Sequence, residues 1–178
     1  MRFIKRILSV LLLLVLLLVG VSYLLPGQAE VSRSVTIDAP PSAIFPYVNS
    51  MQETEKWSPW LSHDPETQLN YSGPEAGVGN TLNWSSEHPQ VGSGSQEIIE
   101  SVPDQTVRTA LDFGSMGTAL AFFDLTPEGN QTKVTWGFSS DLGLNPMARW
   151  MGLMMDQWVG GDYERGLANL KTLVESQG

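Results

Sequence analysis

A long, uncharged aliphatic run near the N-terminus constrains the fold of this chain more than any other feature. The run extends from Ile7 to Leu25 and follows three cations, Arg2, Lys5 and Arg6. A helix rises about 1.5 Å per residue, so about 19 residues span roughly 28 Å, close to the hydrocarbon thickness of a bilayer. The sequence therefore predicts one N-terminal transmembrane helix, and the cations before it predict a cytoplasmic N-terminus.

Two interpretations of this segment stay open, and both export the rest of the chain. A cleaved secretory signal fits the small residues around Ala29, which would allow cleavage before Glu30. A retained anchor fits the length of the run, which exceeds the core of about 7–15 residues in a signal peptide. We expect a retained anchor and short linker over residues 1–29. Residues 30–178 then form one extracytoplasmic domain, periplasmic in a Gram-negative host, or a secreted or periplasmic protein after cleavage.

The exported part is acidic and has no cysteine. All nineteen acidic residues but only seven of the ten cations follow residue 29. This balance opposes binding to nucleic acid or to anionic lipid surfaces. Without cysteine, disulfides, thiol catalysis and thiolate metal sites are excluded. His63 and His88 stand in separate loops with no second histidine at ligand spacing, so we expect no metal ion and no cofactor.

Alternation of apolar and polar residues predicts a domain rich in β-strands. A first strand covers residues 31–37, and a short helix follows over residues 42–49 after a proline break. Six more strand segments follow, separated by short turns that favour an antiparallel meander. These segments are residues 68–72, 82–84, 96–102, 107–113, 120–125 and 134–138.

The last third of the chain changes to a helical period. Asn145 and Pro146 predict a helix start. Six apolar side chains then share one helix face, namely Met147, Trp150, Met151, Met154, Met155 and Trp158. Beyond Gly160-Gly161 the apolar stripe moves by roughly 140°, to Tyr163, Leu167, Leu170 and Val174. One straight helix cannot bury both stripes against one surface, so we predict a kink or break at the glycine pair.

The order of the elements and several motifs resemble the polyketide cyclase/START-like (SRPBCC) superfamily. The motifs run through nearly all of residues 31–174 and include Val35-Thr36-Ile37-Asp38-Ala39-Pro40, Lys56-Trp57-Ser58-Pro59-Trp60 and Glu97-Ile98-Ile99-Glu100-Ser101-Val102-Pro103. The resemblance implies an α+β helix-grip fold, in which a curved antiparallel sheet of about seven strands surrounds a long C-terminal helix and an apolar cavity. The superfamily uses this scaffold for lipid carriage, hormone binding, cyclisation and chaperone regulation, so the fold does not determine the function.

The implied cavity supplies the candidate site residues. Methionine adapts to ligands of variable shape, and the predicted ligand contacts are Trp84, Trp136, Trp150, Met151, Met154, Met155 and Trp158. Phe113 and Phe122 are expected to face this group across the sheet. Trp57 and Trp60 are expected near the cavity mouth, with core packing as the alternative role. Glu97 is the candidate polar group inside the cavity, with a solvated outer face as the alternative.

Three functions are compatible with these sequence features. The first is a membrane-anchored binding module for a hydrophobic small molecule or lipid-like ligand, for which no catalytic residue is needed. The second is a cyclase or dehydratase, which requires a buried acid or base with a shifted pKa. The third is an envelope protein-interaction module, which an exposed apolar patch around Trp57 and Trp60 would favour.

Overall fold

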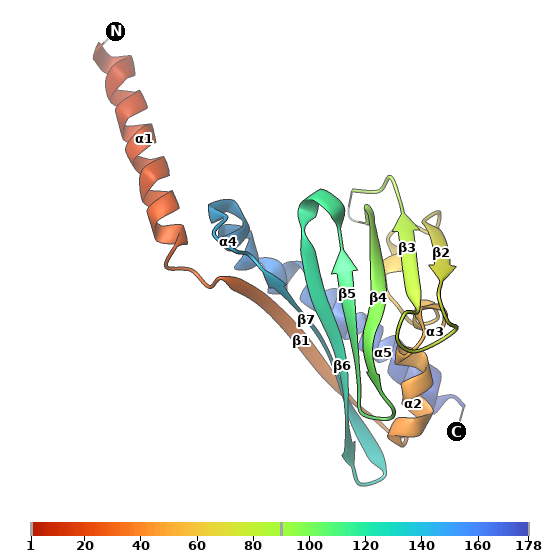
Figure 1. The fold of residues 1–178 in the computed structure, drawn as a ribbon. Coiled ribbons are helices and arrows are strands. Elements are labelled where there is room, and N and C mark those ends of the chain that lie inside the picture. Colours follow the sequence, from red (N-terminus) through yellow and green to blue (C-terminus); the bar gives the residue numbers. More distant parts are fainter. Residues whose placement is uncertain (1, 90, 178) are drawn as a thin grey trace.

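Seven antiparallel strands form one curved sheet in this computed structural model, which describes residues 2–89 and 91–177 (Figure 1). The strands are β1 (Gln28–Ile37), β2 (Gln68–Ser72), β3 (Thr81–Ser85), β4 (Ser93–Val102), β5 (Thr106–Asp112), β6 (Thr118–Glu128) and β7 (Gln131–Asp141). The α-helices are α1 (Arg2–Ser22), α2 (Pro41–Val48), α3 (Met51–Glu55), α4 (Pro146–Gly152) and α5 (Met155–Glu175), and two short 3₁₀ turns are η1 (Trp60–Ser62) and η2 (Gly114–Met116).

Strand order follows the predicted meander. The sheet runs β1-β7-β6-β5-β4-β3-β2, so each strand from β2 to β7 pairs with its sequence neighbour, and β1 pairs with β7. Short turns make these antiparallel neighbours easy to connect. The α+β helix-grip fold that the sequence predicts is confirmed, including a strand at each of the seven predicted places.

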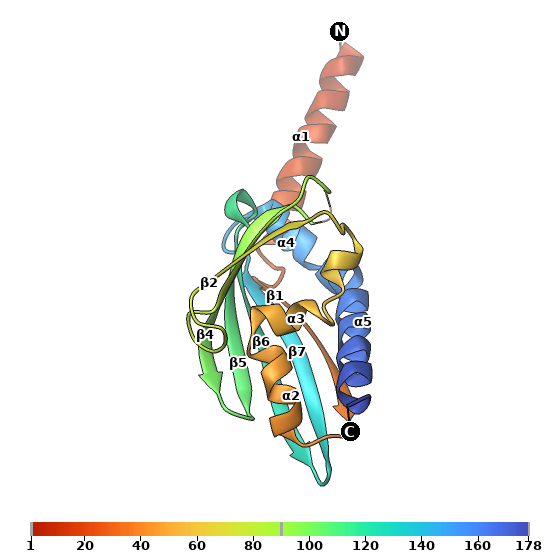
Figure 2. The same ribbon diagram turned by 90° about the vertical axis from the view of Figure 1, so that its right-hand side faces the viewer.

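Three helices cover the concave side of the sheet and bury the core. Figure 2 shows α2, α3 and α5 on this side, and α5 packs mainly along β1. The centre of the core is aromatic: Trp136 stacks on Tyr163 with ring centroids 4.0 Å apart, and Trp57 meets Trp136 edge-on at 5.3 Å. Such contacts add to the burial of the rings, which dominates core energetics.

The predicted kink at Gly160-Gly161 is wrong. Helix α5 continues through both glycines, and the break lies earlier, at residues 153–154 between α4 and α5. Gly160 instead provides space for Arg33 of β1, because a Cβ at residue 160 would lie 2.3 Å from the Arg33 guanidinium. That guanidinium crosses α5 and binds Asp156 and Glu164, each at 2.8 Å. The break therefore divides the first apolar stripe between α4 and the start of α5, and α5 buries the second stripe along its length.

Helix α1 extends away from the domain. Among residues 2–89 and 91–177, it is the one helix long and apolar enough to cross a bilayer, over Phe3–Ser22, and its most apolar stretch is not buried, whereas Ser22 at its end is. A membrane-spanning helix and a signal sequence both have this character. Strand β1 begins at Gln28, two residues before the predicted domain boundary, and its Ala29 is buried.

Candidate functional site

The part of the concave face nearest α4 has a floor of small side chains. Thr109 of β5 pairs with Ala121 of β6, and Ala119 lies two residues away on the same face. All three are buried. Because side chains alternate between the faces of a strand, these residues share the concave face with the core residue Ile98, which pairs with Thr109. Small residues at the middle of a concave sheet leave volume that larger ones would fill.

Larger apolar side chains surround this floor and are only half-buried. Leu82 of β3, Phe138 of β7 and Met155 of α5 pack against the core but keep part of their surface open. Trp84 lies two residues beyond Leu82 on β3, with its ring 5.8 Å from that of Phe113. We name this set the inner apolar surface; it comprises Leu82, Trp84, Thr109, Ala119, Ala121, Phe138 and Met155.

Gln96 presents a polar group on the concave face beside Thr109, and the prediction that Glu97 occupies a cavity is wrong. Gln96 donates from Nε2 to Thr109 Oγ1 at 2.9 Å. Glu97 is exposed and pairs with Ala110 on the outer face of the sheet. Its neighbour Ile98 is fully buried, and adjacent strand residues point to opposite faces, so Glu97 must point outward.

Trp57 is a core residue and does not lie at an opening. Its side chain is 1% exposed, and its indole Nε1 donates to the Tyr47 carbonyl at 3.0 Å. Trp60 is half-buried, with its ring 6.0 Å from that of His63. The apolar patch that would have favoured an interaction module is therefore not formed around Trp57.

The C-terminal candidates are separated by the break between α4 and α5. Trp136 lies in the core, and Trp84 and Met155 belong to the inner apolar surface. Trp150 donates to the Leu18 carbonyl of α1 at 3.3 Å. Roughly half of the side chain is exposed at each of the other three, Met151, Met154 and Trp158. Their predicted role as ligand contacts remains a prediction.

Phe122 does not face the C-terminal candidates as expected. It lies on the outer face of β6, with the Arg108 guanidinium 5.0 Å from its ring centroid. Its neighbour Phe123 instead points into the core, 5.4 Å from Trp136. Both phenylalanines lie in an apolar run without alternating polar residues, so the sequence pattern does not show which of them points into the core. Only the register of the strands in the assembled sheet shows this.

A buried carboxylate that the sequence pattern does not reveal is Asp162 of α5. Its Oδ1 accepts from His63 Nε2 at 3.0 Å and also pairs with Arg165. The contact joins the loop after η1 to α5. The carboxylate has hydrogen-bonding partners, as a buried charge requires. Among residues 2–89 and 91–177, no group of three histidine, aspartate or glutamate side chains is placed to hold a metal ion.

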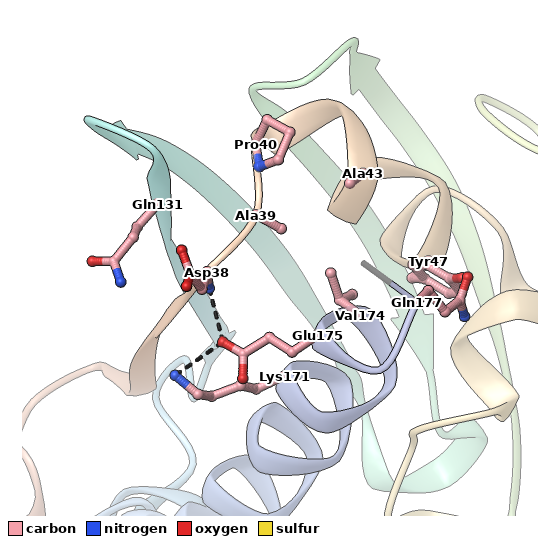
Figure 3. A pocket seen from close by; sticks show the side chains of 10 residues that line it. All are labelled: Asp38, Ala39, Pro40, Ala43, Tyr47, Gln131, Lys171, Val174, Glu175 and Gln177. Atoms are coloured by element: carbon pink, nitrogen blue, oxygen red, sulfur yellow. Dashed lines mark hydrogen bonds and ion pairs between the residues drawn. The ribbon is translucent and has the colours of Figure 1, made fainter.

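A surface groove of about 770 Å³ lies at the opposite end of α5 from α4 (Figure 3). Glu175 accepts the backbone N–H of Asp38 at 2.8 Å and pairs with Lys171 at 3.3 Å, while Lys171 donates to the Thr36 carbonyl. These contacts, the Asp38 N–H foremost, lower the pKa of Glu175. The groove is open, and its charged side chains are paired with each other. These contacts therefore hold the end of α5 to the end of β1.

Comparisons with known proteins agree with this geometry. Residues 28–175 match the family model described as polyketide cyclase / dehydrase and lipid transport. No protein with a curated description matches the chain.

Solved structures share the fold at low sequence identity. Norcoclaurine synthase from Thalictrum flavum, a point mutant in complex with a transition-state analogue, aligns with a TM-score of 0.66 at 11% identity, over 84% of this chain and 96% of that one. Protein MLL2253 from Mesorhizobium loti aligns with a TM-score of 0.57 at 16% identity, over 84% and 98%. Protein Ms6760 from Mycobacterium smegmatis aligns with a TM-score of 0.57 at 13% identity, over 84% and 93%.

Proposed function

This chain belongs to the polyketide cyclase / dehydrase and lipid transport family, and from that premise we propose that it is a membrane-anchored, extracytoplasmic protein that binds a hydrophobic small molecule or lipid-like ligand. The observation that carries the proposal is the inner apolar surface, where Ala119 and Ala121 form a small-residue floor beside half-buried Leu82 and Phe138. Covering roughly 200 Å² of apolar surface gains about 5 kcal/mol before the costs of association.

The polar groups near this surface fit binding without catalysis. The Gln96–Thr109 pair is uncharged, so it can orient a neutral polar group of a ligand without fixing an ion in an apolar surrounding. The buried carboxylate of Asp162 is already engaged by His63 and Arg165. A general acid or base must reach the proton that it transfers. A carboxylate that two side chains already bind is better suited to stabilising the fold than to transferring a proton.

Retention of the N-terminal helix is supported by its contacts with the domain. Arg149 donates to the carbonyls of Ser22 and Tyr23, at 3.4 and 3.3 Å. Cleavage before Glu30 would also remove the buried Ala29 and the first pairing position of β1. With the cations at the N-terminal end of α1 on the cytoplasmic side, the domain lies on the opposite side of the membrane.

The proposal is tested by native mass spectrometry of the full chain, purified from host membranes without added lipid. We expect a discrete co-purifying hydrophobic compound on the wild-type protein and its loss from Ala119→Leu, which fills the floor of the inner apolar surface. Ala110→Leu, on the outer face of the neighbouring strand, is the matched control and should keep the compound. Thermal unfolding of both variants checks that they fold. Equal retention by the two folded variants contradicts binding at this surface.

A further inference from the structure

The exposed apolar side chains of the domain are concentrated at the end from which α1 projects. Beyond residue 25, ten large hydrophobic side chains of the described residues are exposed. Six of them belong to one segment, residues 144–158, and two more, Met116 and Leu120, lie in η2 and at the start of β6, which pairs with the end of β7 that leads into α4. We name the six the α4 surface: Leu144, Met147, Met151, Leu153, Met154 and Trp158. Monomeric soluble proteins rarely expose such residues together.

Hydrogen bonds fix the α4 surface at the level of the last turn of α1. The Trp150 indole donates to the Leu18 carbonyl at 3.3 Å. Leu18 precedes the helix end at Ser22 by four residues, or about 6 Å along the axis. Both views show α4 at the foot of α1, at the top of the domain (Figures 1 and 2). A bilayer that contains α1 therefore has its interface where α4 lies.

The distribution of charged residues in the α4 segment fits a position at the membrane interface. Residues 142–155 contain no acidic residue, although the chain carries nineteen of them after residue 29, and the one acid within the segment 144–158, Asp156, is paired with Arg33. Their one cation, Arg149, is turned towards the carbonyls at the C-terminal end of α1, where the helix dipole is negative. The remaining exposed side chains of α4, including Met147 at 69% exposure, are apolar. A water-facing surface of an acidic domain has no physical need to exclude carboxylates, whereas a lipid-facing one does.

We propose that the α4 surface is buried in the headgroup–acyl boundary of the bilayer that α1 crosses. The proposal rests on the proposed membrane anchoring and adds a second, interfacial contact to it. Trp150 and Trp158 then occupy the depth at which tryptophan is enriched in membrane proteins. The inner apolar surface, whose Met155 follows directly after Met154, consequently lies next to the lipid. A lipid-like ligand can pass between bilayer and protein with little exposure to water.

The absence of native cysteine allows a direct depth measurement on the full chain. We would reconstitute the single-cysteine variants Met147→Cys and Met151→Cys, labelled with the fluorophore NBD, in phosphatidylcholine–phosphatidylglycerol vesicles with brominated acyl chains. Leu13→Cys, in the middle of α1, is the membrane control. Asn130→Cys, in the turn between β6 and β7, is the aqueous control. We expect labels at 147 and 151 to lose roughly half of their fluorescence to bromines near the headgroup, a depth of about 5–10 Å.

The outcomes separate this inference from the anchor on which it rests. Quenching at 13, 147 and 151 but not at 130 supports both. Quenching at 13 alone overturns the interfacial contact and leaves the anchor standing. A blue shift at 147 and 151 without bromine quenching also overturns it, because a protein then covers the surface. The absence of quenching at 13 refutes the membrane anchor and this inference together.

Discussion

Single glycines in α5 show how a local sequence feature takes its meaning from what packs against it. Gly161 is exposed, and a Cβ there would meet only Arg165, at 3.7 Å. Gly166 is buried, and a Cβ there would lie 2.6 Å from the Trp136 ring and 3.0 Å from Pro59. We predict that Gly161→Ala raises stability by up to about 1 kcal/mol, through helix propensity. Gly166→Ala should lower it by about 1–3 kcal/mol, through overpacking.

Urea unfolding of the two variants in the same detergent measures this difference. Because both changes add one methyl group to the interior of one helix, each serves as the other's control. Equal stabilisation by the two substitutions would mean that residue 166 and the Trp136 ring lie further apart than in the structure. A loss of stability in Gly161→Ala would support the original prediction that the glycine pair bends the helix.

At the same scale, strand alternation explains which site residues the sequence could identify. The pattern placed Trp84 and Trp136 on strands of the concave face, because regular alternation fixes the face. It failed for Glu97 because the next two residues, Ile98 and Ile99, are both apolar, so alternation does not decide which face Glu97 takes. Gln96 and Ala119 carry no distinctive chemistry of their own, so only the assembled sheet shows that they share a face.

The C-terminal end of α5 depends on an ionised side chain. The Asp38 N–H and Lys171 hold the pKa of Glu175 below its ordinary value of 4.5. A carboxyl group whose pKa is lowered on folding stabilises the folded state above its unfolded pKa and loses this contribution as the pH falls through its folded pKa. We predict that acidification below about pH 4.5 lowers the unfolding temperature of the wild type more steeply than that of Glu175→Gln.

Thermal unfolding followed by near-ultraviolet circular dichroism across this pH range provides the measurement. Glu128→Gln, at the exposed end of β6, is the control and should follow the wild type. If the unfolding temperatures of the wild type and Glu175→Gln fall equally with pH, ionised Glu175 does not stabilise the contact between α5 and β1. Asp156, whose pKa Arg33 lowers through its hydrogen bonds, changes stability in the same direction and is present in every variant.

Element boundaries show a second limit of sequence reasoning. The start of α4 at Pro146 was predictable, since the Asn145 side chain accepts from the backbone N–H groups of Met147 and Ala148. The break at residues 153–154 directly follows Gly152, the last residue of α4, but a single glycine does not distinguish this place from Gly160-Gly161, through which α5 continues. It follows from tertiary contacts, because Arg149 and Trp150 hold α4 against α1 while Arg33 holds α5 against the sheet. Those contacts join segments more than a hundred residues apart, which periodicity does not report.

For the whole molecule, hydrogen bonds join the end of α1 to the domain, and β1 follows after a short connection. Backbone pairing begins at Gln28 with Asp141, and the carbonyls of Ser22, Tyr23 and Leu25 accept from Arg149. A signal peptide that is cleaved normally leaves an unstructured site for the peptidase. Here the segment before Glu30 is paired in a strand, so its cleavage requires the edge of the sheet to open.

We therefore predict that the mature protein keeps residues 1–29. Intact-mass measurement of the chain expressed in a bacterial host should give the full-length polypeptide, confined to membranes after carbonate washing. Leu13→Arg is the control, because a cation at the centre of a spanning helix costs about 2.5–3.5 kcal/mol. That variant should be depleted from the carbonate-resistant fraction. A wild-type product that begins at Glu30 in the soluble fraction would refute retention. The ligand would then have to reach a free domain through water, and the α4 surface would need another partner.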